Sequence, residues 1–329
     1  MVSNANGNVI AMKIKNILKK LAYGPLCGVF SSAYKLIASA EYAYYTLRWK
    51  AEGAKLPTQQ DAELMRENVT FIYKSFERQK QAKKLYRSIQ SYYPGVKVII
   101  ADDSKTPLDL QDEHAEVIHL PFNSGLSYGL NRALEKVTTP YVVRMDDDEL
   151  LTPHTCFEKH LRFLMGHPEV DLVGVLPLSA PKCEPVSEVA KRYFAQRMDM
   201  PMRKLKIPHM TRIDDDYIVV GKSPNIFIAR TEKIREIGYD DHIRMIDHHD
   251  FFSRAAGRLV SVMAEKSCVF HDHNPFNRAY RRFRMDVEGD RRYIAQKNYI
   301  EMMQYMAQSR RQNDRNENLD NSESGRKEQ

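Results

Sequence analysis

Cysteine is scarce in this sequence, and its scarcity excludes several classes of protein. Four cysteines occur among 329 residues, at positions 27, 156, 183 and 268, and no Cys-x-x-Cys spacing is present. So few cysteines cannot staple a chain of this length, and their spacing encodes neither a zinc knuckle nor a redox dithiol. With 43% apolar and 28% charged residues, the composition is typical of a soluble globular protein in a reducing compartment.

A long hydrophobic run is also missing near the amino terminus. An uncharged run of 14 residues, 21–34, follows lysines at positions 13, 15, 19 and 20, whereas a membrane-spanning helix needs roughly 20 apolar residues. A basic start before a short apolar run fits an interfacial segment on anionic lipid, an amphipathic docking helix or a signal peptide. We expect peripheral contact at the cytoplasmic face of a membrane, and the signal peptide is the weakest alternative because no clean cleavage pattern follows.

Positive charge exceeds negative charge, but unevenly. The formal net charge is +7 and the pI is about 9.0. Residues 1–60 and 191–212 each carry +6, whereas residues 61–190 carry −5. A basic excess favours an anionic partner. Since the excess flanks an acidic middle, it indicates a membrane surface and an anionic donor or acceptor, and it argues against nucleic acid.

Short β-branched runs alternate with helical patterns through the middle of the chain. Strands are expected over 69–73, 96–101, 116–120, 141–145 and 171–177, and helices over 78–92, 126–136 and 153–165. This alternation predicts an α/β fold with a mostly parallel twisted sheet and helices on both faces. Beyond residue 308 the sequence has almost no apolar content, so residues 309–329 should be a disordered tail.

Acidic clusters follow two of the expected strands, at Asp102–Asp103 and at Asp146–Asp148. Ligands of open α/β sheets bind at this carboxyl edge. Residues two apart on an extended strand point the same way, so Asp146 and Asp148 could share a Mn²⁺ or Mg²⁺ ion that also holds a diphosphate. The alternative is a solvated acidic turn, which is our interpretation of the triplet 214–216 because it precedes a strand and lies at the opposite end.

Two downstream motifs could add chemistry to this edge. His271, Asp272 and His273 follow an apolar run, and imidazole with carboxylate suits Mn²⁺ better than Mg²⁺. Asp247 and Asp250 open a helix. An acidic residue at a helix start is commonly a cap, while Asp250, next to an aromatic pair, could have a pKa raised towards that of a general base.

Taken in order, the motifs resemble the nucleotide-sugar glycosyltransferases of the GT-A fold, of the family-2 type. The similarity rests on the first strand with its Lys-Ser, followed by VIIADDS, FNSGLSYGLNRAL and YVVRMDDDELL. The later segments NIFIARTEKIREIGYDDHI, DHHDFF and VFHDHN are similar to the ganglioside-type β-1,4-N-acetylgalactosaminyltransferases. The resemblance covers about residues 68–274. It implies a Rossmann-like nucleotide-binding half (61–180) and an acceptor-binding and catalytic half (181–308) behind a basic segment (1–60).

The resemblance also implies roles for individual residues. The donor nucleotide and sugar would be bordered by Thr70, Lys74, Ser75, Asp102, Asp103, Asn123, Gly125, Asn131, Asp146, Asp147 and Asn225. Asp102 or Asp103 would accept hydrogen bonds from uracil. The metal would be held by Asp146 and Asp148, with His273 as the third ligand and His271 as its runner-up.

Two positions depart from the family pattern. Leu130 stands where the family has arginine, and Arg132 cannot simply replace it because one residue along a helix turns a side chain by about 100°. Arg144 or Lys74 could supply the charge. The Glu-Asp pair that carries the catalytic base is Asp247-His248 here, which leaves Asp250, Asp247 and His248 as candidates. We favour Asp250, then Asp247, because a carboxylate is the usual base in this fold.

The implied reaction is inverting and metal-dependent. A sugar such as GalNAc, GlcNAc or Gal would pass from a UDP-sugar to a hydroxyl of a glycan or lipid-linked glycan, in surface polysaccharide or glycolipid synthesis. The alternatives are a non-catalytic glycan-binding or scaffold relative, and a sugar nucleotidyltransferase. The nucleotidyltransferase's usual glycine-rich loop is absent, since KSFERQKQ after the first strand has no glycine.

Two basic segments remain. Residues 191–212 contain seven Lys and Arg and interrupt the α/β alternation where an acceptor-binding insertion would lie. Residues 276–292 contain six arginines with aromatic neighbours. These arginines could close on donor phosphates as a mobile loop, or cover a solvated helix. Single-stranded nucleic acid would also fit this composition, but it leaves the acidic strand ends unexplained.

Overall fold

The computed structural model describes residues 24–181, 183–196, 203–272, 276, 280, 282–284, 287–300 and 303. The four amino-terminal lysines, His273 and the predicted tail lie outside these residues. The helices are α2 (Cys27–Ala51), α3 (Gln59–Asn68), α4 (Gln79–Tyr92), α5 (Leu126–Glu135), α6 (Phe157–Gly166), α7 (Val186–Phe194), α8 (Thr231–Ile237), α9 (Asp247–Ala255), η1 (Arg282–Arg284) and a helix over 287–300. The strands are β1 (Val69–Ser75), β2 (Lys97–Asp102), β3 (Ala115–His119), β4 (Tyr141–Asp146), β5 (Glu149–Leu150), β6 (Leu172–Ser179), β7 (Arg212–Asp214), β8 (Tyr217–Val219), β9 (Phe227–Arg230) and β10 (Ser261–His271).

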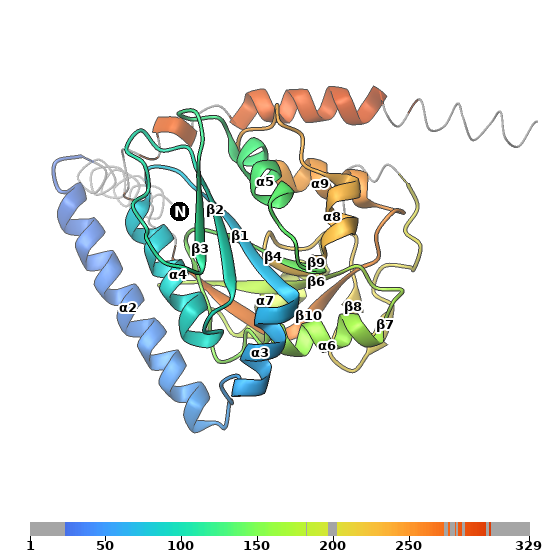
Figure 1. Cartoon of the computed structure of the whole chain (residues 1–329), viewed down its shortest axis with the longest axis horizontal. Coiled ribbons are helices and arrows are strands. Elements are labelled where there is room, and N and C mark those ends of the chain that lie inside the picture. The colour runs from blue at the N-terminus through green and yellow to red at the C-terminus, as the bar shows by residue number, and fades with distance from the viewer. Residues whose placement is uncertain are drawn as a thin grey trace, which may run out of the picture.

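One sheet organises the described part of the chain (Figure 1). Its strand order is β3-β2-β1-β4-β9-β6-β10-β8-β7, with β5 paired to β10. β3, β2, β1 and β4 are parallel neighbours, β9 runs antiparallel between β4 and β6, and β10 is parallel to β6. The carboxyl ends of β1, β4, β6 and β10 therefore lie at the same edge. This arrangement confirms the α/β class and the shared edge that the sequence predicted.

Helices cover both faces of the sheet. The apolar side chains of α3, α4 and α6 pack on one face, and those of α5, α8 and α9 pack on the other. A third apolar cluster joins α2 and α7 to β6, β8 and β10. The amphipathic spacing of Ala82, Leu85, Tyr86 and Ile89 explains how α4 buries one side. The predicted helices on both faces are thus confirmed.

Several smaller expectations can also be checked. Asp215 and Asp216 form the turn between β7 and β8, and Asp216 pairs with Lys159 and Lys266, so the second acidic triplet ends in a surface turn. All four cysteines are free. Among the described helices, none combines the length and the hydropathy that crossing a bilayer requires.

A neutral histidine is built into the interior. His160 on α6 is buried, and its ring nitrogens contact the Tyr217 hydroxyl at 3.0 Å and the Ser267 hydroxyl at 2.9 Å. Burial lowers the pKa of His160 to about 3, because the protonated ring cannot be solvated there. In the unfolded chain the same ring takes up a proton near pH 6.5.

This difference predicts acid sensitivity. Neutral His160 contributes fully to the stability of the fold above about pH 6.5. This contribution is lost as the pH falls towards 3, because in that range the unfolded chain binds a proton at His160 and the folded chain does not. Between about pH 7 and pH 5 we expect a loss of about 2 kcal/mol in the free energy of unfolding, measured by urea denaturation. His160→Gln should flatten this slope, whereas His114→Gln, at a half-exposed site, should not. Equal slopes in both variants would refute the assignment.

Candidate active site

A cavity of about 670 Å³ opens at the carboxyl edge of the sheet. β1 and β4 pair in parallel with Lys74 opposite Asp146, which brings the ends of the two strands together at its floor. The cavity is lined by Lys74, Phe76, Arg78, Asn123, Gly125, Leu126, Asp146, Asp147, Asp148, Asn225, Arg244, Met245, Ile246, His248, His271, Tyr280, Arg282 and Phe283. Cations and carboxylates therefore face the same space.

A buried cation pairs with two of the carboxylates at this edge. Arg78, between β1 and α4, donates from Nη1 to Asp148 Oδ2 at 2.7 Å and from Nε to Asp147 Oδ2 at 3.2 Å. Its guanidinium lies 4.2 Å from the ring centroid of Tyr280. Unpaired carboxylates packed this closely would repel, and Arg78 offsets part of that repulsion. The sequence pattern did not predict this role for Arg78.

His271 extends this cluster from the other half of the sheet. It ends β10 opposite Glu149 of β5, and its Nε2 is 3.7 Å from Asp148 Oδ2. Burial acts to raise the pKa of Asp148, but Arg78 and His271 outweigh burial and lower it. Burial likewise opposes charge on His271, and Asp148 more than compensates, so the pKa of His271 is raised. The structure thus brings together two of the predicted metal ligands.

The donor set for a metal is only partly present in the described residues. Within them, no three side chains of His, Cys, Asp or Glu converge closely enough to hold an ion. Asp148 and His271 form a carboxylate and imidazole pair that suits Mn²⁺. Asp146 is directed instead to Arg144, with Oδ1 at 2.9 Å from Nη2. His273, the predicted third ligand, is outside the described residues.

Arg144 is buried and joins three segments. Besides Asp146, its guanidinium contacts Asp247 Oδ2 at 3.2 Å and donates to the Asn225 carbonyl oxygen at 2.5 Å. These contacts tie the end of β4 to α9 and to the segment before β9. Arg144 is not among the residues that line the cavity, whereas Lys74 is. Of the two, Lys74 is therefore better placed to replace the family arginine at position 130, although its Nζ pairs with Asp103 Oδ1 at 2.6 Å.

The three candidate bases occupy different environments. His248 lines the cavity, and its Nδ1 is 3.9 Å from Asp247 Oδ1. Burial acts to raise the pKa of Asp247, but Arg144 and His248 lower it overall, so Asp247 stays ionised behind the histidine. Asp250 does not line the cavity, and its oxygens pair with Arg254 at 2.7 Å and Lys297 at 2.9 Å. We therefore revise our preference from Asp250 to His248.

Other predicted donor-site residues hold the loops around the cavity. Asp102 accepts from the Ser104 hydroxyl and the Leu108 amide, and Asp103 accepts from the amide of Gly125. The Asn131 side chain donates to the Tyr239 carbonyl oxygen and to Asp241. Of these, only Gly125 lines the cavity.

The first strand contributes to the cavity only at its carboxyl end. Thr70 lies near the amino end of β1, where its hydroxyl accepts from Thr139, and Ser75 is buried. Among the predicted residues of β1, Lys74 alone lines the cavity.

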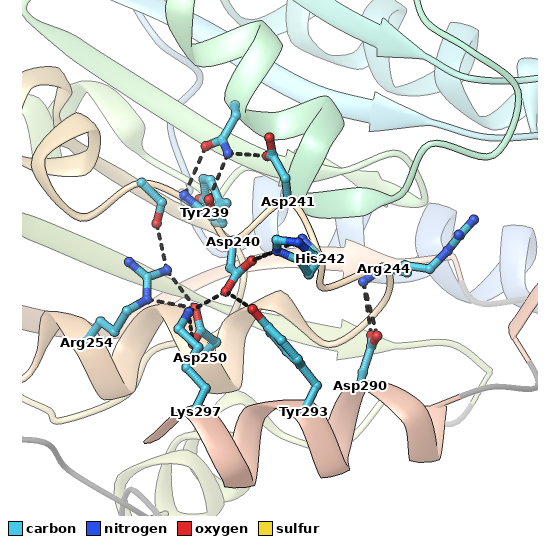
Figure 2. A network of polar contacts seen from close by, with 12 residues as sticks. Tyr239, Asp240, Asp241, His242, Arg244, Asp250, Arg254, Asp290, Tyr293 and Lys297 are labelled. Carbon is cyan, nitrogen blue, oxygen red and sulfur yellow. Dashed lines mark hydrogen bonds and ion pairs between the residues drawn. The ribbon is translucent and has the colours of Figure 1, made fainter. Parts of the chain in front are cut away.

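The helix over 287–300 holds one wall of the cavity through polar contacts. Figure 2 shows its Asp290 and Lys297 directed at the facing segment and at α9. Its Asp290 carboxylate accepts from the backbone amides of Arg244, Met245 and Ile246, which line the cavity. Lys297, on the same helix, bridges Asp240 at 2.5 Å and Asp250 at 2.9 Å. The arginine-rich sequence over 276–292 allowed a solvated helix as one alternative, but the contacts of this helix with the cavity wall could not be predicted, because its partners lie more than 40 residues away along the chain.

Comparison with known proteins gives the following matches. Residues 70–214 match the sequence model of a family described as Glycosyl transferase family 2. Beta-1,4 N-acetylgalactosaminyltransferase 1 of Mus musculus is 33% identical over 201 residues, which cover 58% of this chain and 36% of that protein. Beta-1,4 N-acetylgalactosaminyltransferase 2 of Mus musculus is 33% identical over 199 residues, covering 60% and 38%. This chain thus spans little more than a third of the length of these relatives.

The crystal structure of S. aureus TarS 1-349 aligns with 62% of this chain and 60% of that chain, at a TM-score of 0.46 and 17% identity.

The clamp formed by Asp290 can be tested directly. Asp290→Ala removes both oxygens, including Oδ2, which accepts from the amides of residues 244–246. We expect the free energy of unfolding to fall by about 1–3 kcal/mol. Hydrogen exchange at these amides should also become at least tenfold faster. Glu288→Ala is the matched control, since Glu288 on the same helix is exposed and its Oε2 lies 3.7 Å from Arg291 Nη1. Unchanged exchange in Asp290→Ala would show that this carboxylate does not hold the wall.

Proposed function

We propose that this chain, which contains a glycosyltransferase family 2 domain over residues 70–214, transfers a sugar from a nucleotide-sugar donor to a hydroxyl group of a glycan. The family resemblance predicted from the sequence is confirmed by that match and by the curated relatives. The proposal rests chiefly on one observation. A single cavity is lined by cations, by carboxylates at strand ends and by His248, whose Nδ1 lies 3.9 Å from the carboxylate of Asp247.

The cavity suits an anionic donor. Lys74, Arg78, Arg244 and Arg282 line it, and guanidinium groups pair well with phosphate oxygens. Phe76, Tyr280 and Phe283 add aromatic surface for a base or sugar. We propose a UDP-sugar as the donor, and UDP-GalNAc first because the relatives are named as N-acetylgalactosaminyltransferases. UDP-GlcNAc and UDP-Gal are the alternatives.

The two halves of the chain would have different roles. Residues 61–180 would bind the donor, and residues 181–308 would supply the catalytic group and bind a glycan or lipid-linked glycan at a membrane surface. Asp148 and His271 would hold a divalent cation such as Mn²⁺, which when bound would supply positive charge to the departing diphosphate.

The proposed reaction is a single inverting displacement. The acceptor oxygen forms a bond to the anomeric carbon as the bond from that carbon to the diphosphate breaks, and UDP leaves. His248 would take the hydroxyl proton at Nε2, since its Nδ1 is on the side of Asp247. Asp247, kept ionised by Arg144, would orient the ring and stabilise its protonated form. His248 occupies the position of the family's usual aspartate.

The choice of base can be tested through donor hydrolysis. UDP-sugars would be screened for slow hydrolysis with Mn²⁺, and kcat measured for the best donor. His248→Asn should lower kcat by about 10²–10⁴-fold, the usual contribution of a general base. His249→Asn changes the next residue, which does not line the cavity, and should leave kcat nearly unchanged. Full activity in His248→Asn, with a large loss of kcat in a still folded Asp250→Asn, would reinstate Asp250.

Calorimetry of UDP binding tests the metal assignment separately. Asp148→Ala should weaken Mn²⁺-dependent UDP binding at least tenfold, in line with the loss of a metal ligand. Asp216→Ala is the matched control, because Asp216 belongs to the other acidic triplet and pairs with Lys159 and Lys266 on the surface. Unchanged binding in Asp148→Ala would contradict the assignment. Failure of the unmodified protein to bind UDP would favour a non-catalytic relative of the fold.

A further inference from the structure

Helix α2 exposes an apolar face that no other described element covers. Exposed apolar side chains recur along its 25 residues, among them Val29, Leu36, Ile37, Tyr44 and Leu47. Leu36 is 73% exposed and Leu47 is 68% exposed. The spacing of these residues places them along one side of the helix. Figure 1 shows α2 along one edge of the molecule.

The opposite side of α2 is firmly packed, so its outer face is held in a fixed orientation. Ala38, Tyr42 and Trp49 are buried. The rings of Tyr42 and Trp49 stack on Phe270 of β10 at centroid distances of 4.3 and 5.6 Å. The Tyr34 hydroxyl donates to the Ala180 carbonyl oxygen at 3.0 Å.

Positive charge prevails around this face. The exposed charged residues within α2 are Lys35, Arg48 and Lys50. Glu41 is half-buried and accepts from the Cys183 amide, and Glu52, just after the helix, pairs with Arg48 at 2.7 Å. Four further lysines precede the helix in the sequence, at positions 13, 15, 19 and 20. An apolar stripe flanked by cations complements the headgroups and acyl boundary of an anionic bilayer.

We propose that the outer face of α2 lies in the interface of an anionic lipid membrane, with the helix axis parallel to the surface. A second copy of the chain is the less favourable occupant, because two such faces would bring like charges together. The inference stands apart from the sugar transfer, since lipid binding needs neither donor nor acceptor.

The same helix contacts the segment that reaches the cavity. The Cys27 thiol donates to the Phe276 carbonyl oxygen at 3.0 Å, and the rings of Phe30 and Tyr34 lie 6.0 and 5.6 Å from that of Phe276. Tyr280 and Arg282, a few residues further on, line the cavity. A membrane bound by α2 would therefore lie close to the chain that borders the proposed site.

Vesicle sedimentation of the full chain tests the proposal. The probes are vesicles of phosphatidylcholine alone and of equal parts phosphatidylcholine and phosphatidylglycerol. The unmodified protein should bind the anionic vesicles and bind them less well at high salt. The double variant Leu36→Ser with Leu47→Ser should bind about tenfold more weakly or worse. The double variant Lys35→Glu with Lys50→Glu should have a lower affinity for the anionic vesicles, by roughly fivefold or more for each substitution.

Controls separate lipid binding from other effects. Met165→Ser removes an exposed apolar side chain on α6 and should leave vesicle binding unchanged. Circular dichroism and donor hydrolysis report whether each variant is folded. Three results would overturn the proposal: no binding of the unmodified protein to anionic vesicles, equal binding by the α2 variants, or a dimer of the unmodified protein that the α2 variants convert to monomer while vesicle binding persists. Equal binding would point to the lysines that precede α2.

Discussion

The site depends most on the ion pairs and hydrogen bonds of the buried Arg144 guanidinium. It lies between Asp146 at the end of β4, Asp247 at the start of α9 and the Asn225 carbonyl oxygen before β9. A buried cation without partners is strongly unfavourable, and removing one partner of such a pair costs about 3–5 kcal/mol. Separating any of the three segments from Arg144 would leave this cation without one of its partners, so the free energy of that separation holds them together. The same charge keeps Asp247 ionised behind His248.

Two further cations pair with three more carboxylates at the strand ends. Arg78 pairs with Asp147 and Asp148, and Lys74 pairs with Asp103. Gly129 makes the second pair sterically feasible, since a Cβ at that position would lie 2.7 Å from Lys74 Cγ. The edge of the sheet is thus electrostatically prepared before any ligand arrives. The proposed diphosphate would meet the cations of this network, and the proposed metal ion would meet its carboxylates.

The sequence predicted those parts of the site that follow from strand order. Alternating strands and helices place the ends of β1 and β4 side by side, so Asp146–Asp148 could be assigned to one edge, and His271 joined them because β10 ends there too. The orientation of residues on α9 could not be predicted in the same way. Asp247 and Asp250 are buried while His248 faces the cavity. The residue at which this short helix begins sets which side chains point inwards, and the sequence does not fix that residue closely enough. Arg78 and Asp290 were missed because their partners are 69 and 46 residues away.

The uneven charge of the chain is only partly balanced inside the molecule. Asp103, Asp147 and Asp148 of the acidic middle segment are buried and paired with Lys74 and Arg78. Both cations belong to the same segment, so these contacts account for one of its five net negative charges, and other acidic residues of the segment are exposed. The basic excess lies elsewhere in the sequence, in residues 1–60 and 191–212. On α2 this excess borders exposed apolar side chains, so there it acts where the protein meets its surroundings.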